Sequence, residues 1–224
     1  MKKILLLVLI PLCTTCSTNE ADEINMQLPV LTTKSVTNII SLSGVSGGNI
    51  SDDGGSEITT RGICWDTNKN PTLAHNSFTN GTGIGEYTSE ISNLESNTSY
   101  YVRAFATNSL GTSYGNEVGF KTLKNITYDV VLFEFTPDTG NNTSRLKYEI
   151  TLNNPNDVLV NGFYKITLNI DGIVSSKIAS SSSECYEIGA NSSCTIRFDE
   201  EESLNLGPIN TIDLVSVEYL FDKK

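Results

Sequence analysis

The feature that most constrains the fold is the strict apolar alternation in residues 99–107, SYYVRAFAT. Successive side chains of a β-strand point to opposite faces, so every second residue of this stretch shares a face. One face would carry Tyr100, Val102, Ala104 and Ala106, and the other Tyr101, Arg103, Phe105 and Thr107. The alternation stops at Asn108, where Ser109, Leu110 and Gly111 are typical of a turn. This stretch therefore predicts one strand and the turn that follows it.

Similar short alternations recur through the chain, separated by clusters of Gly, Asn, Ser and Asp, which predicts β-sandwiches. The predicted strands of the first half lie near 36–45, 60–66, 85–91, 99–106 and 117–121. Those of the second half lie near 128–135, 146–152, 162–170, 175–179, 185–188, 195–198 and 212–221. We expect an all-β chain with one sandwich over residues 28–124 and another over 125–224, each of immunoglobulin-like size.

The first residues, MKKILLLVLIPLCTTC, have the pattern of an export signal. Lys2 and Lys3 precede an apolar run from Ile4 to Leu12, which is much shorter than the ~20 residues of a membrane-spanning helix. We therefore interpret residues 1–15 as a signal peptide. The apolar run, the cysteine and the polar stretch after it resemble a bacterial lipoprotein signal, in which Cys16 is lipidated.

The resemblance has two departures, because Thr15 and Cys13 stand where such signals carry a small residue and a leucine. Cys13 is the competing acceptor, and secretion without a lipid is the alternative. Residues 16–27 would then form a flexible tether, since they are rich in Asn, Glu and Asp. Acyl chains would attach the protein to a membrane. The expected location is the cell envelope, as an outer-membrane lipoprotein. The sequence does not distinguish between the external and the periplasmic side of that membrane.

The chain is acidic, with 26 Asp and Glu against 15 Lys and Arg and a formal net charge of −11. Binding to nucleic acid depends on clustered Lys and Arg that neutralise phosphates. We find no basic run after residue 3, so nucleic acid is not expected as a partner.

Three cysteines follow the signal, and export would take them to an oxidising compartment. A two-residue turn at Gly189 and Ala190 would place Cys185 opposite Cys194 in a hairpin, close enough for a disulfide. We expect that disulfide to be structural. Cys64, in RGICW, is expected to be a buried, inert strand cysteine.

Residues 94–111, LESNTSYYVRAFATNSLG, resemble the fibronectin type III signature. The matching positions are Leu94, Thr98, Tyr100, Val102, Ala106 and Asn108, while Ser96 replaces the usual proline. The resemblance implies that Tyr100 forms a tyrosine corner, with its ring inside and its hydroxyl bonded back to the main chain. The resemblance covers about residues 30–123. This wider stretch is similar to modules of lipid-anchored envelope proteins of Gram-negative bacteria. The second half has only the general layout of an immunoglobulin-like module.

Catalytic groups are scarce in this sequence. The single histidine, His75, has no nucleophile motif beside it, and we expect it in a solvated loop. Glu134, Glu149 and Glu187 lie on predicted strands, but the sequence brings no two of them together across a cleft. The glycines of GTGIGEY lack the lysine and helix of a phosphate loop and predict a hairpin turn.

Metal sites are not expected either. Calcium needs only oxygen ligands, but Pro71 and Ser77 interrupt the EF-hand-like start at Asp66. The acidic stretches SDDGGSE and DEEE are interpreted as solvated loops, with weak calcium binding as the alternative. We predict no cofactor and no metal.

The best candidate for a contact surface is the outer row of Tyr101, Arg103 and Phe105, with local sheet packing as the other interpretation. The sequence thus predicts a non-enzymatic, lipid-anchored binding or spacing module. Its partners would be the membrane, through the lipid, and an extracellular glycan or another envelope protein. The alternatives are a structural subunit of a fimbria-like surface assembly and an accessory component of a hydrolase system. The assembly alternative requires an exposed strand edge, which makes the last predicted strand important.

Overall fold

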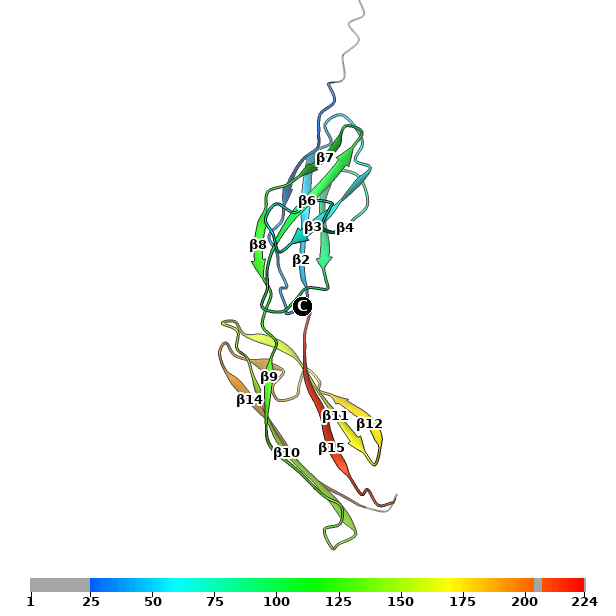
Figure 1. The fold of residues 1–224 in the computed structure, drawn as a ribbon, viewed down its shortest axis with the longest axis vertical. Helices are drawn as coiled ribbons and strands as arrows, with labels where there is room; N and C mark the ends of the chain where they lie inside the picture. Colours follow the sequence, from blue (N-terminus) through cyan, green and yellow to red (C-terminus); the bar gives the residue numbers. More distant parts are fainter. Residues whose placement is uncertain (1–24, 204–206, 224) are drawn as a thin grey trace, which may run out of the picture.

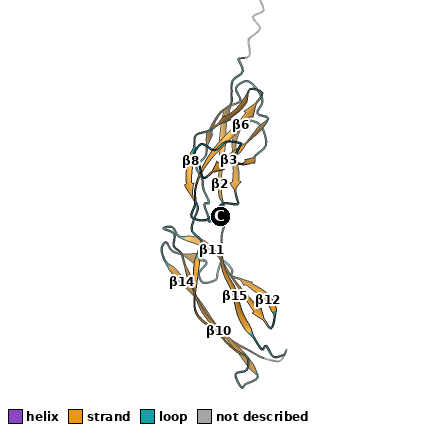
Figure 2. Cartoon of the chain, viewed as in Figure 1, coloured by secondary structure: helices purple, strands orange, loops and turns teal. Residues whose placement is uncertain are grey.

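A computed structural model describes residues 25–203 and 207–223 of the chain. The predicted signal peptide and the predicted lipidation site at Cys16 lie outside these residues. The described chain is all-β and forms two sandwiches arranged end to end (Figure 1, Figure 2). No helix in the described ranges is long and apolar enough to cross a membrane.

The first domain consists of two facing sheets with all of its pairings antiparallel. The three-stranded sheet has the order β1–β2–β5, with β1 (Val30–Thr33), β2 (Gly44–Asp52) and β5 (Gly85–Ile91). The five-stranded sheet has the order β4–β3–β6–β7, with β8 also pairing with β6. Its strands are β3 (Thr60–Asp66), β4 (Asn76–Thr79), β6 (Ser99–Asn108), β7 (Gly111–Tyr114) and β8 (Val118–Lys121).

The core of the first domain follows from the alternation of its strands. Ile63 lies opposite Ala104 and Trp65 opposite Val102, and all four side chains point inward. Trp65 is therefore a core residue. Gly48 allows the two sheets to approach here, because a Cβ on it would lie 2.7 Å from both the Ala104 Cβ and the Tyr87 hydroxyl. The apolar faces found in the sequence therefore form one packed layer.

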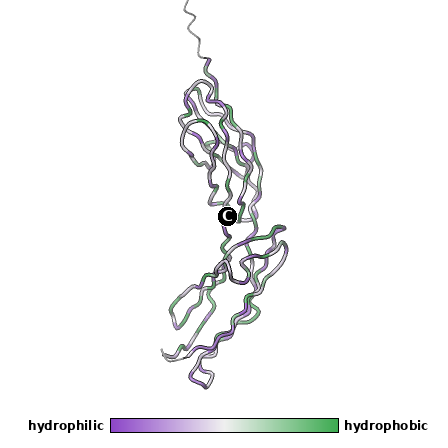
Figure 3. Tube along the Cα trace, turned by 180° about the vertical axis from the view of Figure 1, so that it is seen from behind, coloured by the Kyte–Doolittle hydropathy of each residue, from purple (hydrophilic) through white to green (hydrophobic). Residues whose placement is uncertain are grey.

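The second domain also has two antiparallel sheets. One sheet has the order β14–β10–β9, with β9 (Thr127–Thr136), β10 (Thr143–Asn153) and β14 (Ser193–Ser203). In the other sheet, β11 pairs with β12, β13 and β15. These strands are β11 (Val160–Ile170), β12 (Ile173–Ile178), β13 (Glu187–Ile188) and β15 (Ile212–Phe221). The turns are polar, as the β9–β10 turn shows in Figure 3.

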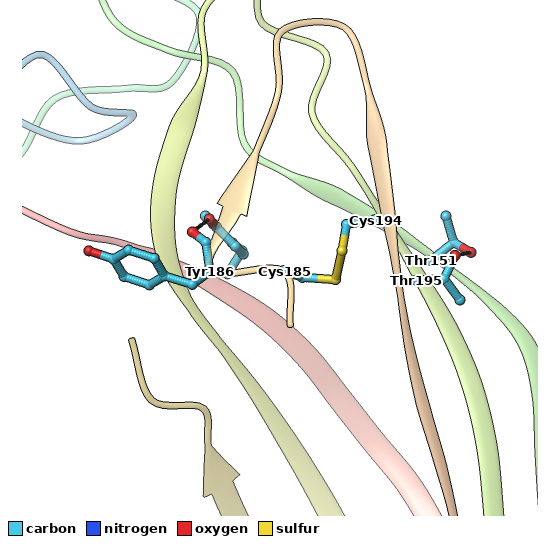
Figure 4. Close-up of a disulfide and its surroundings, with 6 residues drawn as sticks. Thr151, Cys185, Tyr186, Cys194 and Thr195 are labelled. Atoms are coloured by element: carbon cyan, nitrogen blue, oxygen red, sulfur yellow. Dashed lines mark hydrogen bonds between the residues drawn. A yellow bond between two sulfur atoms is a disulfide. The ribbon is translucent and has the colours of Figure 1, made fainter. Parts of the chain in front are cut away.

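A disulfide joins Cys185 to Cys194, as the sequence predicted, but the hairpin geometry expected for it is wrong. β13, which follows Cys185, pairs with β11, whereas Cys194 lies on β14 opposite Leu152 of β10. The chain therefore crosses from one sheet to the other, and the disulfide links the two sheets (Figure 4). The crossing is held by the buried side-chain amide of Asn154, which donates to the carbonyls of Ile188 and Gly189 at 3.1 and 2.9 Å.

The two domains differ at corresponding strands. In the first domain, β6 pairs with β3 along one edge and with β7 and β8 along the other. In the second domain, β15 takes the position of β6, but among the described residues it pairs with β11 alone. No described strand is therefore hydrogen-bonded to the other edge of β15, although β9 of the facing sheet lies near it.

The junction between the domains is short and hydrogen-bonded. Asn156 is buried, and its side chain accepts from the Lys124 main-chain N–H at 2.8 Å and donates to the Lys124 carbonyl at 3.1 Å. The Leu123 N–H donates to the Ile40 carbonyl at 3.3 Å. After β15 the chain returns to the junction, where Lys223 forms an ion pair with Glu90 at 2.6 Å. The described N-terminal segment enters at the opposite end of the first domain (Figure 1).

Candidate functional site

Tyr100 has the geometry that the fibronectin type III resemblance implied. Its ring is buried in the first core and lies 5.7 Å from the Phe120 ring, centroid to centroid. Its hydroxyl accepts a hydrogen bond from the Glu95 main-chain N–H at 3.0 Å. This contact ties the turn before β6 to the strand itself, so the role of Tyr100 is structural.

The outer face of β6 is a cluster of cations and aromatic rings. The Arg103 guanidinium lies 4.9 Å from the Tyr114 ring centroid, and the Lys69 ammonium 5.8 Å from that of Tyr101. Arg103 also donates to the Gly115 carbonyl at 2.9 Å, and the Tyr114 hydroxyl accepts from the Leu73 N–H at 3.2 Å. These contacts hold β6, β7 and the loop after β3 together.

Phe105 does not belong to an exposed row, and this part of the sequence prediction is wrong. Its side chain is only 1% exposed. Gly62 lies directly opposite on β3, and a Cβ at Gly62 would lie 2.9 Å from the Phe105 ring. Because glycine has no side chain, the Phe105 ring can pack against β3 at Gly62 instead of projecting into solvent.

Tyr101 and Arg103 remain half-buried on the surface, but each aromatic ring of the cluster already has a cation against it. A sugar-binding platform needs an open ring face on which the ligand can stack. The geometry of the cluster therefore favours local sheet packing, the second of the two sequence interpretations. The contact of Lys69 with Tyr101 was not predicted from the sequence, because it depends on the path of the loop after β3.

Beneath Arg103, Cys64 is fully buried on the same outer side of the sheet. Burial raises the pKa of its thiol to about 11, while the charge of Arg103 opposes the shift. Nucleophilic cysteines need an accessible thiolate. Cys64 is therefore a poor nucleophile at neutral pH.

The polar residues weighed for catalysis are engaged separately. The His75 ring accepts from the Thr72 N–H at 3.0 Å within its own exposed loop. Glu149 forms an ion pair with Arg197 at 2.8 Å on the outer face of its sheet, while Glu134 and Glu187 lie on other strands. The structure does not bring these three carboxylates together across a cleft.

The acidic stretches also have local partners. Asp52 and Asp53 accept from the main-chain N–H groups of Gly54 and Gly55 in a turn. Asp199 receives two bonds from Arg145, at 2.7 and 2.9 Å, and the guanidinium lowers the pKa of this carboxyl. In the described part of the chain no three His, Cys, Asp or Glu side chains gather as metal ligands would.

Among the clefts on the described part of the chain, two differ clearly in character. A polar one of about 440 Å³ lies at the junction, lined mainly by amides and ammonium groups such as those of Asn97, Lys121 and Asn191. An apolar one of about 140 Å³ opens between the sheets of the second domain. Its lining includes Phe135, Leu146, Leu168, Phe198 and Ile212, with the carboxylates of Glu200 and Glu202 at its side.

No protein-family model matches this chain, and a comparison with curated proteins found no match. Among solved structures, the FN1–FN3 domains of chicken CNTN1 are similar at 13% identity and a TM-score of 0.33, over 84% of this chain and 65% of that one. Red sea bream transglutaminase is similar at 10% identity and a TM-score of 0.32, over 88% of this chain and 30% of that one. Neither similarity indicates an activity, and the sandwich assignment rests on the strand pairing itself.

Proposed function

We propose that this chain is a non-enzymatic, lipid-anchored cell-envelope protein that acts as a spacer and binding module. The observation that carries the proposal is the position of the two ends of the molecule. The N-terminal segment enters the first domain at the end farthest from the second domain (Figure 1). An anchor at Cys16 would therefore hold the first sandwich near the membrane and present the second sandwich outward, to an extracellular glycan or another envelope protein.

The junction supports this role, because a spacer works only if its domains keep their relative orientation. The two hydrogen bonds between Asn156 and the main chain of Lys124 restrain the connecting segment. The ion pair of Lys223 with Glu90 adds a second contact, although an exposed pair contributes little by itself. With these restraints, two sandwiches in line act as one extended body.

The proposal can be tested on lipid vesicles that carry the lipidated chain and an acceptor dye in the bilayer. A donor dye is attached either at Glu57→Cys, in the turn near Gln27, or at Asn141→Cys, in the β9–β10 turn of the second domain. We expect strong energy transfer from position 57 and weak transfer from position 141. Equal transfer from both positions would show that the protein lies flat on the membrane and would refute the spacer role. Mass spectrometry of the same protein tests lipidation of Cys16.

A further inference from the structure

We infer that the second domain accepts an added β-strand from another polypeptide, in which apolar residues alternate with Lys or Arg. The inference goes beyond the spacer role, because it concerns the free edge of β15 and holds whether or not the chain is anchored. The site is the free edge of β15 together with the edge of β9 that lies near it, and each of these two strands pairs with a single described strand.

The main chain of β15 is oriented for such pairing. The Gly162 N–H of β11 donates to Tyr186, and the Tyr164 carbonyl accepts from Ala179, so both groups face away from β15. Phe221 and Tyr219 lie opposite these two residues. In an antiparallel pair, the main-chain groups of two opposite residues either bond to each other or point away from each other. Since Gly162 and Tyr164 point away from β15, the main-chain groups of Phe221 and Tyr219 point away from β11, toward the free edge. Val217, two residues earlier, has the same orientation.

Beside this edge, two apolar side chains of β9 point into the domain but remain partly exposed to solvent. Tyr128 and Val130 of β9 lie opposite Leu152 and Ile150 of β10, which are fully buried inside the domain. Residues directly opposite each other share a face, so Tyr128 and Val130 also point inward. They nevertheless remain 42% and 44% exposed. Apolar side chains that point into a domain are normally covered by other residues. The exposure of Tyr128 and Val130 therefore indicates that no described strand covers them.

The first domain provides the internal reference. There, β7 and β8 pair with β6 along the edge that corresponds to the free edge of β15. An exposed row of N–H and C=O groups is a template for another strand, and natural sheets usually cover it. The described residues after β15, Asp222 and Lys223, turn toward the first domain and do not run back along this edge.

Charge selects the occupant. β9 carries Asp129 and Glu134, β15 carries Asp213 and Glu218, and neither strand contains Lys or Arg. Glu218 is matched by Lys165, and Glu134 lies opposite Lys147. Asp129 and Asp213 have no Lys or Arg opposite them, so the border of the site keeps a negative charge. A strand with basic residues on its outward face would complement this border, whereas a second copy of this acidic chain would not. Apolar residues on its inward face would cover Tyr128 and Val130.

The test uses the full chain and an acetylated, amidated peptide, Lys-Val-Lys-Ile-Lys-Val-Lys-Ile-Lys, with binding followed by fluorescence anisotropy. In an antiparallel added strand, the inward-facing Val and Ile residues bond to β15. Methylating their nitrogens should weaken binding by about ten-fold or more, while methylating the Lys nitrogens, as the matched control, should change it by less than about two-fold. Bound peptide should also slow amide exchange at Val217, Tyr219 and Phe221.

A pair of protein variants separates strand addition at this edge from general charge attraction. Val130→Asp places a carboxylate on the inward face of β9, and Val131→Asp places the same charge at the exposed bulge beside it. We expect the first to weaken binding by about ten-fold and the second to leave it nearly unchanged. Equal effects of the two variants, equal effects of the two methylated peptides, or no binding by folded protein would overturn the inference. Protection of the three amides by self-association alone would overturn it as well, since the occupant would then be a second copy.

Discussion

The side-chain amide of Asn156 brackets the main chain of Lys124, accepting from its N–H at 2.8 Å and donating to its carbonyl at 3.1 Å. A single buried side chain of the second domain thus satisfies both polar groups of the residue that connects the domains. The relative orientation of the sandwiches depends on this contact more than on the exposed ion pair between Lys223 and Glu90.

The first prediction concerns that contact. Asn156→Ala removes both bonds and should broaden the distribution of distances between spin labels placed in the two domains. It should also lower the free energy of unfolding of the second domain by about 1–2 kcal/mol, because Asn156 is buried among polar partners. Asn153→Ala is the matched control, since the exposed bond from Asn153 to Asp129 does not touch the junction. An unchanged distance distribution in Asn156→Ala would show that the junction is held in another way.

The second prediction concerns the disulfide between the sheets of the second domain. Replacing Cys185 and Cys194 by alanine should lower the free energy of unfolding of that domain by roughly 2–3 kcal/mol, on the loop-entropy argument for a separation of nine residues. Domain-resolved denaturation with chemical denaturant measures this change. The first domain should unfold as before, because the disulfide does not reach it. A loss shared equally by both domains would contradict the separation of the two cores.

The third prediction concerns the alkaline stability of the first domain. The pKa of Cys64 is about 11 in the folded state, against 9.0 for a free thiol, because burial disfavours the thiolate. The folded protein therefore holds its proton longer than the unfolded chain, and stability falls as the pH rises through this window. Between pH 8 and 10 the loss should be about 1 kcal/mol in the natural chain and should be absent in Cys64→Ala. The same slope in both proteins would show that another group titrates.

The fourth prediction separates the two residues that the sequence placed in one row. Phe105→Ala should destabilise the first domain by about 3–5 kcal/mol, because a fully buried ring is lost over Gly62. Tyr101→Ala, on the same face, should cost less than about 1 kcal/mol, because its ring is partly exposed. Thermal denaturation of the two variants checks the difference. Similar costs would indicate that Phe105 is not packed as described.

The local pattern of apolar and polar residues was sufficient to predict much of this fold. The alternation around Tyr100 and Val102 predicted the strand, its inner face and the tyrosine corner, because period-two burial is written directly into the sequence. The Cys185–Cys194 pairing was also predictable, since few cysteines were available.

The features that were missed depend on which strands become neighbours. The hairpin expected at Gly189 fails because Asn154, far away in sequence, holds the chain as it crosses between sheets. Phe105 looked like an outer residue because nothing local shows that Gly62 lies beside it. In the same way, β15 reads as an ordinary strand, and its free edge appears only when the neighbours of each strand are known.

The central structural claim is that the second sandwich leaves one edge of β15 open, and amide exchange measured by NMR on the full chain tests it most directly. Along β15, the amides of Ser216, Glu218 and Leu220 should exchange slowly, because they face β11, and those of Val217, Tyr219 and Phe221 should exchange rapidly. Along β6, which is paired on both edges, protection should not alternate in this way. Uniformly slow exchange along β15 in the monomeric protein would show that the edge is already covered and would contradict the account.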